Sequence, residues 1–245
     1  MAFSRRTALR TTLLGGAGVA VATAVPACSS EGTAAAPAAA ASASPSATPA
    51  PEDAAAAMRL LEEGNTRWRN NSSIHPNEGA ERREELTEGQ SPFATILSCA
   101  DSRVPPELIF DQGLGDIFTI RSAGQVLADS VLGSVSYAGL HIDSTRLIVV
   151  LGHQSCGAVT AAVEAHESGE VPEGHVGYLV EEILPVVEAT PDEGEDFLDD
   201  CVRANAVDIA GRLQEDEDLR DLVEAGTLEI VPARYDLETG EVTWL

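Results

Sequence analysis

The chain has 245 residues, of which 40 are acidic and 15 basic, and its formal net charge is −25 at pH 7. So much negative charge argues against nucleic acid or an anionic membrane surface as a partner. Residues 53–245 are enough for one α/β domain with a full hydrophobic core.

The chain begins with a pattern typical of an export signal peptide, which we place at residues 1–27. Arg5 and Arg6 precede a short apolar run that ends in small residues, and the arginine pair resembles the twin-arginine type of signal. Cys28 follows a stretch similar to a lipoprotein cleavage site, so we expect it to carry lipid; the alternative is plain secretion. We expect the protein at the outer face of the cell membrane, which it would contact only through the lipid anchor. If Cys28 is not lipidated, we expect the protein to be secreted into the medium.

Residues 28–52 consist mostly of Ala, Ser and Pro. Without large side chains this segment has nothing from which to build a core, so we predict a flexible tether behind the lipidated cysteine. The folded domain is then expected to span residues 53–245.

Beyond the tether, hydrophobic periodicity and turn residues predict alternating helices and strands. Helices are expected at residues 51–64, 107–111, 129–140, 156–166, 173–189 and 196–225, and strands at 94–98, 116–120, 146–151, 228–231 and 241–245. Gly64 is expected to end the first helix, and Asp129 to cap another.

The strands at 94–98 and 146–151 are continuous apolar runs, which suit strands covered on both faces. We therefore predict an α/β fold with a mostly parallel central sheet of about four strands, an antiparallel edge strand, and helices on both faces.

Metal-binding residue types follow both of these apolar runs. Cys99 comes directly after the first, and His153 and Cys156 follow the second. Because the carboxyl ends of parallel strands meet at one edge of a sheet, two thiolates and one imidazole should converge there. Three such ligands leave the fourth tetrahedral position of Zn²⁺ open, which is the catalytic arrangement. The alternative is two ordinary buried cysteines and a histidine at a strand end.

The two motifs, Cys99-Ala-Asp-Ser-Arg103 and His153-Gln-Ser-Cys-Gly157, together resemble the signature of the β-class carbonic anhydrases. The resemblance continues through residues 104–107, 110–118 and 121–124. It covers most of the chain from about residue 54 onward.

This resemblance implies the reversible hydration of CO2 to bicarbonate and a proton, by a hydroxide on a Zn²⁺ ion that Cys99, His153 and Cys156 hold. Asp101 and Arg103 would be the catalytic pair, with Arg103 holding Asp101 away from the zinc while Asp101 accepts the hydrogen of the hydroxide. An ordinary ion pair at a strand end is the alternative for these two residues.

The resemblance also assigns Gln112 and Gly157 to the substrate pocket. Gln112 would reach the site of a neighbouring subunit, so self-association as a dimer or a higher oligomer is expected. At position 112 an ordinary loop glutamine is the alternative.

Two other functions suit parts of the same pattern. One is hydrolysis of CS2 or COS, linear molecules that the same fold and metal shell can accept. The other is a non-catalytic, zinc-bearing surface module held by its lipid. Asp101 and Arg103 argue against the module, because a structural zinc site has no use for them.

Overall fold

The computed structural model describes residues 51–192 and 196–245. The predicted signal peptide, the lipidation site at Cys28 and the tether as far as residue 50 lie outside these residues. Among the helices that are described, none has both the length and the apolar character needed to span a bilayer.

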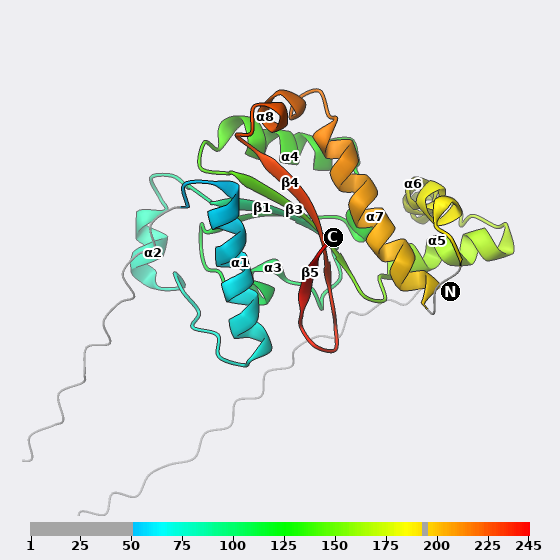
Figure 1. Ribbon diagram of the computed structural model, residues 1–245, viewed down its shortest axis with the longest axis horizontal. Helices are drawn as coiled ribbons and strands as arrows, with labels where there is room; N and C mark the ends of the chain where they lie inside the picture. The colour runs from blue at the N-terminus through cyan, green and yellow to red at the C-terminus, as the bar shows by residue number, and fades with distance from the viewer. Residues whose placement is uncertain (1–50, 193–195) are drawn as a thin grey trace, which may run out of the picture. The chain divides into compact units, whose positions relative to one another are not determined.

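A single sheet of five strands lies at the centre of the fold, in the order β2-β1-β3-β4-β5 (Figure 1). The strands are β1 Ala94–Ser98, β2 Ile117–Arg121, β3 Leu147–His153, β4 Glu229–Tyr235 and β5 Val242–Trp244. The first four are parallel, and β5 pairs with β4 in the antiparallel direction. The predicted α/β fold with an antiparallel edge strand is thereby confirmed.

Helices surround this sheet. They are α1 Ala54–Arg69, α2 Ala80–Glu85, α3 Pro106–Ile109, α4 Asp129–His141, α5 Gly157–Ser168, α6 His175–Ala189, α7 Phe197–Gln214 and α8 Arg220–Glu224, with a 3-10 turn, η1, at Ala123–Gln125. Figure 1 shows α7 running alongside β4. Neither α2 nor η1 was predicted.

Two hydrophobic clusters, one on each face of the sheet, form the core. In β3, Leu147, Val149 and Leu151 belong to the cluster with α1, α5 and α6, whereas Ile148 and Val150 belong to the cluster with α4 and α8. All five side chains are buried. An apolar side chain at every position is therefore what the central strand needs, since both of its faces are covered.

The first helix does not end at Gly64 as predicted. It continues to Arg69, and Asp53 caps its start by accepting a hydrogen bond from the Ala56 amide. Gly64 is buried inside the helix because α1 passes so close to the carbonyl group of Phe110 that an added Cβ would overlap it. The glycine permits a close approach of two segments rather than a helix stop.

Two further predictions are wrong in detail. Asp129 is the first residue of α4 rather than its cap, which is Ala128, and its charge lies in the first turn, where the helix dipole favours it. The helix expected over 196–225 is divided into α7 and α8, because Asp216 forms a turn in which its side chain accepts a hydrogen bond from the Asp218 amide.

Candidate metal centre and active site

The carboxyl ends of β1 and β3 bring the three predicted metal ligands together. Ser98 in β1 pairs with Leu151 in β3, so that Cys99 and His153 leave the sheet at the same edge. A tight turn with Ser155 in the left-handed region (φ 53°) then places Cys156 at the start of α5. The convergence predicted from the two apolar runs is confirmed.

The three donor atoms form a compact, buried group. The Sγ atoms of Cys99 and Cys156 are 3.9 Å apart, and all three donors lie within 4.8 Å of one another. Cys99 is 4% exposed, His153 0% and Cys156 1%. In the part of the chain that the structure describes, this is the one group of three or more Cys, His and acidic residues placed to hold a metal ion.

The pKa values of the two thiols are shifted in opposite directions. The hydrogen bond from Cys156, together with that from the Gly124 amide, lowers the pKa of Cys99 to about 4. The same contact with Cys99, with burial, raises the pKa of Cys156. A divalent cation would replace the remaining proton, because metal ligands bind as thiolates.

His153 is oriented for coordination. Its Nδ1 lies 2.9 Å from the carbonyl oxygen of Gln154, and since a carbonyl only accepts, Nδ1 must carry the hydrogen. The lone pair is then on Nε2, which is buried and has no hydrogen-bond partner among the residues that the structure describes. An unpartnered buried nitrogen beside two thiols fits a metal ligand, and the Cys2His donor set suits Zn²⁺.

Asp101 and Arg103 form a two-pronged ion pair beside this group. Arg103 Nε donates to Asp101 Oδ1 at 2.9 Å, and Nη2 donates to Oδ2 at 2.7 Å. The Arg103 amide also donates to Oδ1 at 2.9 Å. Chiefly through the Arg103 side chain, the pKa of Asp101 falls to about 2, so the carboxylate stays ionised at neutral pH.

Arg121 is a residue at this site to which the sequence analysis gave no role. Its Nε donates to the carbonyl oxygen of Cys99 at 2.9 Å, and its Nη2 donates to that of Asp101 at 2.6 Å. The register pairs Arg121 with Ser98, which brings its side chain alongside the loop after β1. The sequence offered one indication of this role: Arg121 ends β2, which runs parallel to the strand that precedes Cys99.

The two residues assigned to the substrate pocket lie in different surroundings. Gly157 follows Cys156 directly, is exposed, and has open space where a Cβ would be. Gln112 donates from Nε2 to the carbonyl oxygen of Phe110 at 2.8 Å and lines two cavities, neither of which includes the three metal-binding residues. In this single chain, therefore, Gln112 is not brought to the metal centre.

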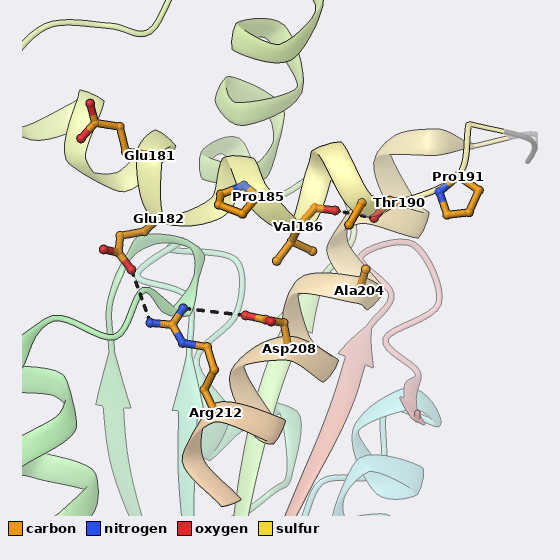
Figure 2. A pocket seen from close by; sticks show the side chains of 10 residues that line it. Glu181, Glu182, Pro185, Val186, Thr190, Pro191, Ala204, Asp208 and Arg212 are labelled. Carbon is orange, nitrogen blue, oxygen red and sulfur yellow. Dashed lines mark hydrogen bonds and ion pairs between the residues drawn. The ribbon is translucent and has the colours of Figure 1, made fainter. Parts of the chain in front are cut away.

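A cavity of about 560 Å³ between α6 and α7 lies away from these residues (Figure 2). Three of its charged side chains form ion pairs, with Arg212 3.4 Å from Glu182 and 3.7 Å from Asp208. The residues that line it include no Cys or His. This hollow does not offer the chemistry of the metal centre.

Comparison with known proteins identifies the family. The family model described as carbonic anhydrase matches residues 94–242, more than half of the chain. The chain belongs to the β-class carbonic anhydrase family.

Two curated relatives are similar over most of the chain. A carbonic anhydrase of Mycolicibacterium smegmatis is 41% identical over 188 residues, which cover 76% of this chain and 91% of that protein. Carbonic anhydrase 2 of Mycobacterium tuberculosis is 40% identical over 186 residues, which cover 76% of this chain and 89% of that protein.

Solved structures of the β class resemble the fold. The β-carbonic anhydrase CcaA has 27% identity and a TM-score of 0.59 and covers 76% of this chain and 94% of that chain. One of two tetrameric β-carbonic anhydrases from Sordaria macrospora has 20% identity and a TM-score of 0.60, and the match covers 77% of this chain and 96% of that chain. The reaction of the family, the reversible hydration of CO2, is therefore the reaction of this enzyme, as the sequence motifs predicted.

Proposed function

We propose that Cys99, His153 and Cys156 hold one Zn²⁺ ion and that CO2 is hydrated beside it. The observation that carries this proposal is the buried group of two sulfur atoms and the unpartnered Nε2 of His153, all within 4.8 Å. Zinc, when bound there, supplies a Lewis acid that lowers the pKa of a water molecule in its open position.

Asp101 is the residue that orients this water molecule. With its pKa lowered to about 2, its carboxylate accepts hydrogen bonds at neutral pH and does not donate them. Asp101 would therefore hold a hydrogen of that water molecule at a carboxylate oxygen. Arg103 keeps both carboxylate oxygens in place, so Asp101 is restrained from turning toward the metal ligands.

Arg121 supports the same arrangement through the backbone. Because it binds the carbonyl oxygens of both Cys99 and Asp101, it fixes the positions of these two residues relative to each other. Arg121 is thus a positioning residue, and Asp101 acts on the reacting water.

The proposal includes a dimer or a higher oligomer in which Gln112 lies at the neighbouring subunit's site. Two exposed apolar residues, Ile74 and Leu114, each line a cavity that Gln112 also lines. Cover by a second copy of the chain would remove this apolar surface from water. Sedimentation of the wild type and of Leu114→Glu tests this idea, with a dimer expected for the first and a shift toward monomer for the second.

The enzyme is also proposed to act outside the cytoplasm, held by lipid on Cys28. The support is the order of the first residues: an arginine pair, an apolar run, a cysteine and then the Ala/Ser/Pro tether. Detergent-phase partitioning of the wild type and of Cys28→Ser is the test, with only the wild type expected in the detergent phase.

Zinc content measured together with CO2 hydration tests the metal centre. Cys156→Ser should lose most of its zinc and its activity, because serine is a poor zinc ligand. Cys201→Ala is the matched control, since Cys201 is also a buried free cysteine but is not one of the three proposed ligands. Full activity in zinc-free wild type would contradict the proposal.

A further inference from the structure

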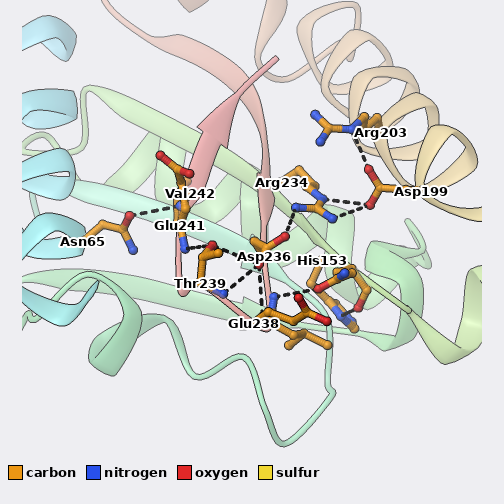
Figure 3. A network of polar contacts seen from close by, with 12 residues as sticks. Asn65, His153, Asp199, Arg203, Arg234, Asp236, Glu238, Thr239, Glu241 and Val242 are labelled. Atoms are coloured by element: carbon orange, nitrogen blue, oxygen red, sulfur yellow. Dashed lines mark hydrogen bonds and ion pairs between the residues drawn. The ribbon is translucent and has the colours of Figure 1, made fainter. Parts of the chain in front are cut away.

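The β4–β5 hairpin, whose turn is residues 236–241, contacts Gln154, the residue directly after His153 at the end of β3. The Gln154 amide donates to the carbonyl oxygen of Tyr235 at 2.9 Å, and the Leu237 amide donates to Gln154 Oε1 at 3.1 Å. Figure 3 shows Asp236, Glu238 and Thr239 of this turn. Gln154 is thus bound to the hairpin by its backbone on one side and by its side chain on the other.

The orientation of His153 depends on the same residue. The carbonyl group of Gln154 accepts the hydrogen of His153 Nδ1 at 2.9 Å, which directs Nε2 to the two thiols. A rotation of the Gln154 peptide would move this carbonyl and release the imidazole. Residues that hold the carbonyl therefore control the geometry of a metal ligand.

The turn is itself fixed, so it can serve as a support. Asp236 accepts hydrogen bonds from the Glu238 amide at 3.0 Å and the Thr239 amide at 2.8 Å, and Arg234 Nη1 donates to its other oxygen at 2.7 Å. Arg234 also binds Asp199 of α7, with Nε 2.8 Å from Oδ1 (Figure 3).

Helix α1 holds the other side of the hairpin. Asn65, which is buried, donates to the carbonyl oxygen of Gly240 at 2.8 Å and accepts from the Val242 amide at 3.0 Å. The hairpin is therefore connected to α1, to α7 and to Gln154. Its position cannot change without breaking bonds to at least one of them.

We propose that Gln154 is a positioning residue for the metal: its side-chain oxygen, held by the hairpin, fixes the carbonyl that orients His153. The inference rests on the proposed zinc site and deepens it. If Gln154 only anchored the hairpin, its loss would lower the stability of the fold and leave metal binding unchanged.

Two substitutions distinguish these roles. Gln154→Leu removes the acceptor for the Leu237 amide at similar volume, whereas Gln154→Glu retains it. On the full-length protein, competition with a chelator should show zinc affinity about tenfold weaker for Gln154→Leu and within about threefold of wild type for Gln154→Glu. Arg69→Ala, which removes the exposed ion pair with Glu241 on the same hairpin, should leave the affinity unchanged.

A second readout reports the geometry of the site directly. With Co²⁺ in place of Zn²⁺, the visible absorption of Gln154→Leu should shift or broaden relative to wild type, and that of Gln154→Glu should not. If Gln154→Leu does not fold, Gln154→Ala lacks the same acceptor and provides the same comparison.

The outcomes separate the two proposals. The proposed role of Gln154 would be overturned if the variant without the acceptor kept wild-type zinc affinity and an unchanged Co²⁺ spectrum. This holds even if the thermal stability of that variant falls. Failure of the wild type to bind zinc would overturn the metal centre and, with it, this inference.

Discussion

Arg103 holds both carboxylate oxygens of Asp101, with Nε 2.9 Å from Oδ1 and Nη2 2.7 Å from Oδ2. The pair is part of the loop that follows Cys99, so the carboxylate and the metal ligand belong to one short segment. This arrangement keeps an ionised acceptor beside the proposed metal ligands.

Arg103→Ala should lower kcat/KM for CO2 hydration by about 100-fold, because Asp101 loses the two side-chain donors that restrain it. Zinc content should stay near that of the wild type, since Arg103 contacts none of the donor atoms. Steady-state hydration assays with metal analysis check both expectations.

Arg212→Ala is the matched control for this variant, because Arg212 also pairs with two carboxylates but lies at the cavity between α6 and α7. It should retain activity within about twofold, as exposed ion pairs contribute little. Equal losses in the two variants would contradict a specific role for Arg103.

Gly64→Ala should destabilise the protein by about 1–3 kcal/mol, the usual cost of overpacking, although alanine is the better helix former. The added Cβ would overlap the carbonyl group of Phe110 and push α1 away from α3. Urea unfolding measures the change.

Gly211→Ala in α7 is the control, because its Cβ meets nothing within 4 Å, and it should be neutral or stabilising. A stabilised Gly64→Ala variant would show that the two segments are not in close contact.

Asp236 should contribute stability that depends on pH. Burial opposes its charged form, but the Thr239 amide and Arg234 outweigh burial and lower its pKa from the ordinary 3.8 to about 2. Because the folded pKa is below the unfolded one, the carboxylate stabilises the fold above about pH 4, and this contribution is lost as the pH falls through about 2.

Asp236→Asn should therefore reduce the free energy of unfolding by about 1–2 kcal/mol at pH 7, and the difference from wild type should shrink toward pH 3. Urea unfolding between pH 7 and pH 3 provides the comparison. Glu238→Gln, an exposed carboxylate on the same turn, should change stability by less than about 0.5 kcal/mol throughout. A difference for Asp236→Asn that does not vary with pH would exclude the electrostatic explanation.

The grouping of Cys99, His153 and Cys156 was predictable from the sequence because its signals are local. An uninterrupted apolar run indicates a strand covered on both faces, and the residues just after such a strand lie at the edge where ligands bind. Cys99 follows β1, and His153 and Cys156 follow the apolar part of β3, so two short motifs were enough to place all three donors.

The supporting contacts were not predictable in this way, because they join segments far apart in the chain. Gly64 reads locally as a helix stop, and only the approach of α1 to Phe110 explains its place inside the helix. Arg121 binds the carbonyl oxygens of Cys99 and Asp101 at a position set by strand register, and Gln154 accepts the Leu237 amide of the β4–β5 hairpin. Such contacts depend on tertiary structure and leave little trace in residue type.

Stopped-flow CO2 hydration by the full-length protein, with zinc measured on the same sample, tests the central claim most directly. We predict rapid turnover with about one zinc per chain, the stoichiometry of a three-ligand site, and in Asp101→Asn a large loss of turnover with the zinc retained. Stoichiometric zinc without CO2 hydration, or full activity in Asp101→Asn, would contradict the account.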